Sequence, residues 1–173
     1  MFTSIVLVIA SSGYQPIEYD TPKRKLKDAG FEVVTVSDRL GTAISKDPSI
    51  TTQVDCLVSD VSAEIYDGLF FIGGHGALEH LDNEISYTVL RKWKQSGKPY
   101  GAICVSPRIL ANAGVLNGKQ ATGWDGDGEL AGIFERCGVE YLRKDVVVDG
   151  HVVTANGPRA AEGFGKKIIQ VCS

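Results

Sequence analysis

An unbroken apolar run near the amino end constrains the fold of this chain more than any other feature. Residues 4–10 read SIVLVIA, with no polar residue at alternate positions. A strand with one face in water would alternate apolar and polar residues, so this run predicts a strand buried on both faces. Such strands belong to parallel sheets that are covered by helices on both sides. The run therefore predicts an α/β architecture.

The rest of the chain alternates apolar runs with amphipathic segments. Further strands are predicted at 31–36, 67–72, 99–103 and 119–122, and helices at 16–29, 84–95, 106–113, 129–137 and 160–171. Asp149-Gly150 predicts the tight turn of a hairpin between 145–148 and 151–154. Strands that alternate with helices indicate parallel βαβ units. We expect one domain over 1–173, an open α/β sandwich with a mostly parallel sheet and helices on both faces.

Composition excludes several classes of protein. The net charge is −3 with 23% charged residues, so no basic stripe is expected to bind nucleic acid. Hydrophobic residues make up 43%, but no apolar run approaches the ~18 residues that a membrane helix needs. No basic segment precedes the first apolar run, as it would in a signal peptide. We expect a cytoplasmic protein that binds neither nucleic acid nor membrane.

Metal and cofactor motifs are weak or missing. The four cysteines, at 56, 104, 137 and 172, form no CxxC pair, and no histidine pair has zinc-site spacing. Asp125-Gly-Asp127-Gly-Glu129 is similar to the start of a calcium loop, but Leu130 stands where that loop needs its turn glycine. The nucleotide motifs GxGxxG and GxxxxGK are absent from the sequence. We expect neither a metal nor a cofactor.

One cysteine has a pattern that points to chemistry. Cys104 ends a predicted buried strand, and a helix is predicted two residues later, which is the order of a nucleophile elbow. Ala102 and Ser106 are small enough for that turn, and Pro107 suits the first turn of the helix. A thiol at a helix amino terminus is expected to have a lowered pKa. The alternative is that Cys104 is a small buried side chain without chemistry.

The joint order of several short motifs resembles the DJ-1/PfpI superfamily over essentially the whole chain. The motifs are DGLFFIGG at 67–74, GAIC at 101–104 with Pro107, AGVL at 113–116, GKQAT at 118–122, VDG at 148–150, and Thr154 with Gly157-Pro158. Glu18 falls where DJ-1-like members carry a glutamate beside the cysteine.

This resemblance implies a flavodoxin-like fold, a homodimer, and Cys104 as a reactive nucleophile. It implies that Glu18 is a protonated carboxylic acid that hydrogen-bonds the thiolate, because two adjacent anions would repel. Without the resemblance, Glu18 would be read as a first-turn glutamate that complements the helix dipole. The resemblance also implies an oxyanion hole from the backbone N–H groups of Gly74 and Val105.

The sequence departs from the family where a histidine is usual. Val105 follows the cysteine, and Trp124 occupies roughly the place of the other family histidine. His75 follows the oxyanion glycine, so it is a candidate base or substrate donor, with a solvent-facing loop histidine as the alternative. Amide hydrolysis needs a group that protonates the leaving amine, so this departure disfavours a cysteine peptidase or amidase.

The reaction we expect is covalent catalysis on a small-molecule electrophile, with glyoxalase- or deglycase-like action on 2-oxoaldehydes leading, or a related hydratase reaction. The alternative is a redox sensor or stress-protective protein that is oxidised at Cys104 without turnover. A third alternative is an inactive dimeric scaffold. Turnover separates the first from the other two.

Overall fold

A seven-stranded sheet forms the centre of the computed structural model, which describes residues 2–173. Its order is β11-β12-β8-β7-β1-β3-β6, and all neighbours are parallel except the hairpin β11–β12. The strands are β1 (Ser4–Val8), β3 (Glu32–Ser37), β6 (Cys56–Leu57), β7 (Gly68–Phe71), β8 (Tyr100–Ile103), β11 (Val146–Asp149) and β12 (Val152–Ala155). The predicted parallel sheet is therefore confirmed.

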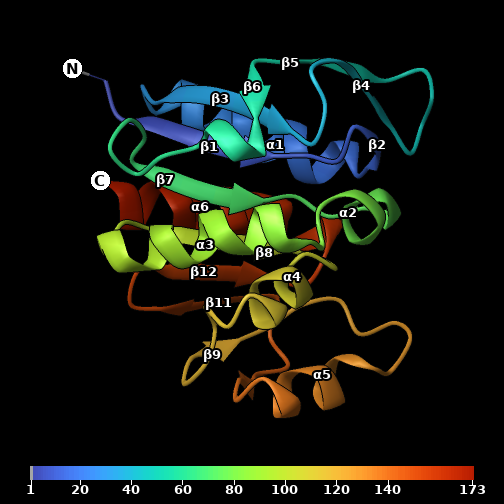
Figure 1. Ribbon diagram of the computed structural model, residues 1–173, viewed down its shortest axis with the longest axis vertical. Coiled ribbons are helices and arrows are strands. Elements are labelled where there is room, and N and C mark those ends of the chain that lie inside the picture. Colours follow the sequence, from blue (N-terminus) through green and yellow to red (C-terminus); the bar gives the residue numbers. More distant parts are fainter. Residues whose placement is uncertain (1) are drawn as a thin grey trace.

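Helices cover both faces of this sheet (Figure 1). Helices α1 (Pro16–Asp28) and α6 (Ala161–Cys172) pack together on one face, and α3 (Glu84–Ser96) and α4 (Pro107–Asn112) lie on the other. Helix α5 (Leu130–Arg136) packs against α4. Short 3-10 turns, η1 (Val58–Asp60) and η2 (Pro158–Ala160), complete this set. The arrangement confirms the predicted α/β sandwich.

Smaller elements stand at the edges of the sandwich. Strands β2 (Ser12–Tyr14), β4 (Gly41–Ser45) and β5 (Thr51–Val54) form a three-stranded sheet, and β9 (Gln120–Ala121) pairs with β10 (Glu140–Tyr141). Helix α2 (His75–His80) is absent from the predicted elements, because six residues after two glycines give no helical period. Gly76 packs closely on Ser12, because a Cβ at position 76 would lie 1.7 Å from the carbonyl oxygen of Ser12. This contact joins α2 to β2.

The core explains the unbroken apolar run. Ile5 to Ala10 have no exposed surface, because helices cover β1 on both sides. Phe70 of β7 and Phe164 of α6 meet edge to face, with ring centroids 6.0 Å apart. Buried Tyr100 donates its hydroxyl to the carbonyl of Val115 at 2.6 Å, so its polar atom is satisfied. Each large apolar side chain in this core contributes about 1.5–3 kcal/mol of burial free energy.

The hairpin is present with its turn one residue later than predicted. Asp149 pairs with Val152, which leaves Gly150 and His151 as the two-residue loop. Gly150 has φ 61°, a left-handed conformation that glycine adopts without strain. His151 is exposed.

The strand order fixes where a site can form. From β1 the chain moves outward to β3 and β6, then returns to β7 on the other side of β1 and continues to β8 and β12. Ligands bind open α/β sheets beyond the carboxyl ends of the strands at such a reversal. The segments after β1, β7 and β8 meet at that end of the sheet.

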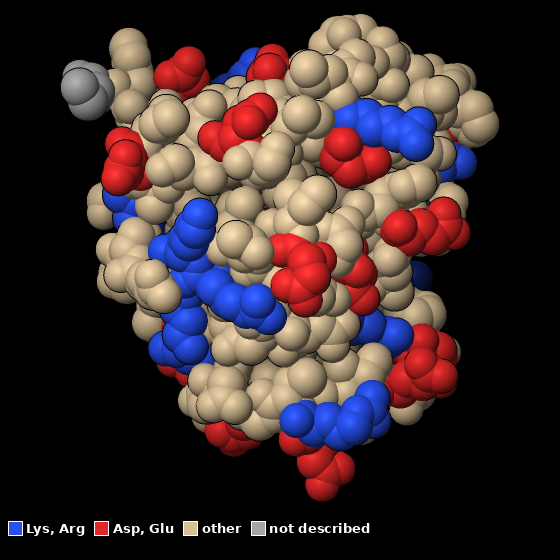
Figure 2. Space-filling view, viewed as in Figure 1, with Lys and Arg blue, Asp and Glu red and all other residues tan. Residues whose placement is uncertain are grey.

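Surface charge is mixed on the face that carries α3. Figure 2 shows a group of basic side chains over α3, which contributes Arg91, Lys92 and Lys94, with acidic side chains beside them. Arg91 pairs with Glu84 of the same helix at 3.6 Å. Among the described residues, no helix combines the length and apolar character needed to cross a membrane.

Candidate active site at Cys104

Cys104 has a strained backbone. Its φ is 65°, and among residues 2–173 it is the one non-glycine residue with a positive φ. Its N–H donates to the carbonyl of Ala155 at 2.9 Å, and its carbonyl accepts from the N–H of Trp124 at 2.7 Å. Such a conformation costs about 1–3 kcal/mol and persists only where neighbouring groups impose it. The sharp strand-to-helix turn predicted here is therefore present.

Small residues allow this turn to pack. Ala102 and Ser106 are fully buried, and the Ser106 hydroxyl donates to the carbonyl of Ile72 at 2.7 Å. Gly73 lies between the two predicted site residues, because a Cβ there would lie 2.5 Å from Cβ of Cys104 and 2.6 Å from Oε1 of Glu18. A side chain at position 73 would force the two apart.

Glu18 reaches the cysteine from the first turn of α1. The helix begins at Pro16, and the side chain of Gln15 caps it by accepting from the N–H of Ile17 at 3.1 Å. The Glu18 carboxyl has no exposed surface, and its Oε1 accepts from the N–H of Gly73 at 3.1 Å. Its Oε2 is buried without a well-aligned partner, and the Cys104 thiol lies within hydrogen-bonding reach of the carboxyl. The structure thus brings Glu18 and Cys104 together.

Burial controls the protonation of this pair. Burial raises the pKa of Glu18 from its usual 4.5 to about 7, although hydrogen bonds from Cys104 and Gly73 oppose the rise. Burial, and then the charge of Glu18, raise the pKa of Cys104 to about 12. From about pH 7 upward the pair therefore holds one proton, which the Cys104 thiol keeps beside an ionised Glu18 carboxylate, the reverse of the protonated Glu18 and thiolate that the resemblance implies. The lowering predicted from the helix amino terminus is wrong in sign, because burial and a neighbouring carboxylate outweigh the local N–H groups.

Two backbone N–H groups point at the sulfur. The N–H groups of Gly74 and Val105 lie close enough to the sulfur that each lowers the pKa of the thiol, although burial outweighs both. Gly74 has φ 105°, and a Cβ there would lie 2.3 Å from the carbonyl oxygen of Gly13, so glycine is required. A negative charge on the sulfur would be stabilised by two N–H groups, whereas a negative charge on Glu18 is stabilised by one, the N–H of Gly73.

His75 does not join this group through any hydrogen bond found in residues 2–173. Its side chain is exposed, and its ring lies over Gly13, where a Cβ would approach Nε2 to 2.6 Å. The proposed role of His75 as a base or substrate donor stays a prediction.

Trp124 neighbours the cysteine through its backbone. Its indole is 38% exposed and lies over Gly126, where a Cβ would come within 2.3 Å of the ring. The guanidinium of Arg108 lies 5.6 Å from the same ring. The sequence interpretation did not identify Arg108, although a charged residue in the apolar segment PRILAN is a signal for a buried ion pair.

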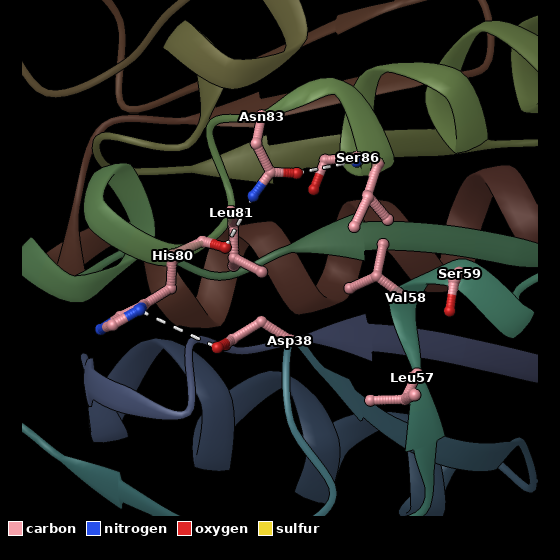
Figure 3. A pocket seen from close by; sticks show the side chains of 9 residues that line it. Asp38, Leu57, Val58, Ser59, His80, Leu81, Asn83 and Ser86 are labelled. Atoms are coloured by element: carbon pink, nitrogen blue, oxygen red, sulfur yellow. Dashed lines mark hydrogen bonds and ion pairs between the residues drawn. The ribbon is translucent and has the colours of Figure 1, made fainter.

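A groove of about 150 Å³ lies away from Cys104, between η1 and the start of α3. Figure 3 shows His80 directed at Asp38, with 3.9 Å between Nδ1 and Oδ2. Asp38 already accepts from the N–H and hydroxyl of Ser11, and Asn83 caps α3 by accepting from the N–H of Ser86. These polar groups have structural roles, and we assign the groove no function. Within the described chain, no three His, Cys, Asp or Glu side chains converge as metal ligands would.

Comparison with known proteins identifies the family. Residues 3–171 match the model of the DJ-1/PfpI family. The chain belongs to the DJ-1/PfpI family. A deglycase of Pyrococcus horikoshii is 33% identical over 166 residues, which cover 96% of this chain and 98% of that protein. A putative cysteine protease of Bacillus subtilis is 25% identical, over 96% of both chains.

Solved structures of DJ-1/PfpI proteins have the same flavodoxin-like fold. A ThiJ/PfpI domain protein from Brachyspira murdochii superposes with a TM-score of 0.91 at 27% identity, covering 99% of this chain and 97% of that one. DJ-1 of Schizosaccharomyces pombe gives a TM-score of 0.82 at 25% identity, covering 99% and 92%. The family expected from the sequence motifs is confirmed.

Proposed function

We propose that this DJ-1/PfpI protein acts on small electrophilic carbonyl compounds, 2-oxoaldehydes or their adducts with amines, with Cys104 as nucleophile. The observation that carries the proposal is the contact between Cys104 and the buried Glu18 at a strained turn. Relatives named as deglycases, about 30% identical over 96% of the chain, support this class of reaction.

The first step forms a carbon–sulfur bond. The Glu18 carboxylate takes the proton of the Cys104 thiol, the resulting thiolate attacks the aldehyde carbon, and the electron pair of the C=O bond moves to oxygen. Glu18 gives that oxygen its proton, so the product is a thiohemiacetal beside a carboxylate. The N–H groups of Gly74 and Val105 stabilise the negative charge, first on sulfur and then on the developing oxyanion. One proton between the two side chains is the state that this step needs.

The second step is an internal oxidation and reduction that needs no external oxidant. The Glu18 carboxylate takes the proton from the thiohemiacetal carbon, and the electron pair of that C–H bond forms a C=C bond to the neighbouring carbon, whose oxygen takes up a proton to give an enediol. Glu18 then returns its proton to the neighbouring carbon, while the thiohemiacetal hydroxyl loses the proton that balances the one taken up by the other oxygen. The oxidised carbon becomes a thioester and the reduced carbon becomes an alcohol. Water then hydrolyses the thioester, which releases a 2-hydroxy acid and restores the thiol. The sum is addition of one water to the 2-oxoaldehyde.

A second candidate function has a specific observation in its favour. The buried carboxyl and the two N–H groups around the sulfur are donors that suit the oxygens of a sulfinate as well as an oxyanion. A redox sensor that is oxidised at Cys104 would use the same three groups without turnover. Cysteine peptidase activity has less support, because Val105 stands where a histidine would assist the leaving amine.

Incubation with methylglyoxal tests the proposal, with lactate formation and methylglyoxal loss measured over many enzyme equivalents. We expect multiple turnovers for the native chain and none for Cys104→Ser. Cys137→Ser is the matched control, because Cys137 is a free, partly buried thiol outside the site, and it should keep full activity. Loss of at most one equivalent of methylglyoxal per protein would refute the enzyme proposal. One equivalent of peroxide consumed at Cys104 would then favour the sensor.

The resemblance also implies a homodimer, and we propose that the protein associates in this way. Sedimentation equilibrium gives the mass directly, and a species at the monomer mass of 18.6 kDa across the concentration range would contradict it.

A further inference from the structure

Arg108 is a buried charge four residues beyond the thiol. It lies in α4 with 5% of its surface exposed, among apolar neighbours of the same helix. Its Nη1 and Nη2 donate to the two carboxylate oxygens of Asp127 at 2.9 and 2.7 Å, and Nη2 also donates to the carbonyl of Trp124 at 3.2 Å. Both acceptors belong to residues 123–128, called here the 123–128 loop.

The 123–128 loop holds the backbone of the cysteine. The N–H of Trp124 donates to the carbonyl of Cys104 at 2.7 Å, which is one of the two hydrogen bonds on the strained peptide groups. Gly123 packs against the same carbonyl group, because a Cβ at position 123 would come within 3.2 Å of the carbonyl oxygen of Cys104. The indole of Trp124 packs against Gly126 of the same loop, and the guanidinium of Arg108 lies 5.6 Å from its ring. Arg108 therefore contacts the loop through a carboxylate, a carbonyl and a ring.

Stability alone does not explain this arrangement. The Nε of Arg108 is buried without a partner, and an unpaired buried donor costs free energy. Buried ion pairs can often be replaced by apolar side chains of similar volume without loss of stability. A planar guanidinium has a different advantage, because its fork fixes the orientation of what it binds.

We propose that Arg108 is a positioning residue that holds the 123–128 loop against the elbow and so keeps Cys104 in its left-handed conformation. This conformation directs the sulfur toward the N–H groups of Gly74 and Val105. The inference deepens the proposed function, because it rests on Cys104 as the reacting group. It concerns the reactivity of the thiol, which can be measured without any substrate.

Alkylation of Cys104 by iodoacetamide between pH 5 and 10, followed by peptide mass spectrometry, tests the role. For Arg108→Met we expect the apparent pKa of the reaction to rise by about one unit, because the sulfur loses N–H donors. Because the native thiol pKa of about 12 lies above this pH range, the rate then falls about tenfold at every pH in it. Asp127→Ala should give the same profile, and the double variant should be no worse than either single one.

Arg91→Met is the matched control. Arg91 also donates to a carbonyl, that of Ala113 at 3.0 Å, and lies 5.8 Å from the ring of Tyr87, but it contacts the opposite end of α4. Its alkylation profile should equal that of the native chain. Arg108→Lys keeps the charge without the fork, and provides a folded variant if Arg108→Met fails to fold. We expect the same rise in its apparent pKa.

Two results would overturn the inference. An unchanged profile in folded Arg108 variants would make the residue purely structural. A higher rate across the same pH range would mean that the loop only covers the thiol. Failure of the proposed function looks different: the native thiol would alkylate with its normal profile, Arg108 variants would shift it, and no 2-oxoaldehyde would turn over.

Discussion

Replacing Glu18 by glutamine should make the protein more stable at pH 8 than the native chain, and should have little effect at pH 4.5. The folded protein raises the pKa of Glu18 from 4.5 to about 7, chiefly by burial. Below pH 4.5 the carboxyl is protonated in both the folded and the unfolded chain, so it makes no difference to the free energy of unfolding. Between pH 4.5 and about 7 the unfolded chain releases this proton first, and the folded state loses stability.

The size of the effect follows from the same values. A rise from 4.5 to about 7 corresponds to about 3 kcal/mol, at about 1.4 kcal/mol for each pKa unit. Glutamine has nearly the same shape and no charge to bury, so Glu18→Gln should recover this amount at pH 8. In a domain of this size that is a rise in Tm of about 6–12 °C. The free energy of unfolding of Glu18→Gln should not change between pH 4.5 and about 7, where that of the native chain falls.

Urea unfolding at pH 4.5, 6 and 8 measures the difference. Glu162→Gln is the control, because Glu162 is exposed and pairs with Lys25 at 2.8 Å, which lowers the pKa of its carboxyl. Glu162→Gln should therefore show a small effect of the opposite sign. If Glu18→Gln and the native chain differ by the same amount at all three pH values, Glu18 is not a buried acid with a raised pKa. The proton transfers proposed for it would then lose their basis.

Two further changes test the site and the core. Gly73→Ala puts a methyl group within 2.5 Å of Cβ of Cys104 and 2.6 Å of Oε1 of Glu18. We therefore expect alkylation of Cys104, measured by peptide mass spectrometry, to slow at least tenfold. An unchanged rate would mean that the reactivity of the thiol does not need the contact between Cys104 and Glu18. Phe164→Ala removes a fully buried ring that packs on Phe70, and should lower the free energy of unfolding in urea by about 3–5 kcal/mol; a loss below about 1 kcal/mol would contradict the packing described.

Most of the fold could be predicted from the sequence because the signals for its elements lie within short stretches of the chain. The apolar run at 4–10 predicts a buried strand, and Pro16 and Pro107 predict the starts of α1 and α4. Tertiary contacts overrule none of these preferences. Helix α2 escaped prediction because it is set by a tertiary contact, the close packing of Gly76 on Ser12, which leaves no periodic signal.

The site was less accessible from sequence, because it joins residues that are distant along the chain. The elbow at Cys104 could be read from neighbours on either side, but Glu18 was assigned to it only through the family resemblance. The sign of the thiol pKa was wrong, because a helix terminus is visible in a sequence and the depth of burial is not. The pairing of Arg108 with Asp127 depends on a loop conformation that composition does not determine.

The hydrogen bond from Cys104 to Ala155 has a consequence for synthesis of the chain. The acceptor stands in β12, 51 positions after the cysteine, so it leaves the ribosome later. At about 5–20 residues per second, the thiol exists for roughly 3–10 s before the carbonyl that helps to strain it has been made. In that interval Cys104 is an ordinary cysteine of an unfinished chain. The strained conformation of the elbow is thus completed only when β12 has joined the sheet.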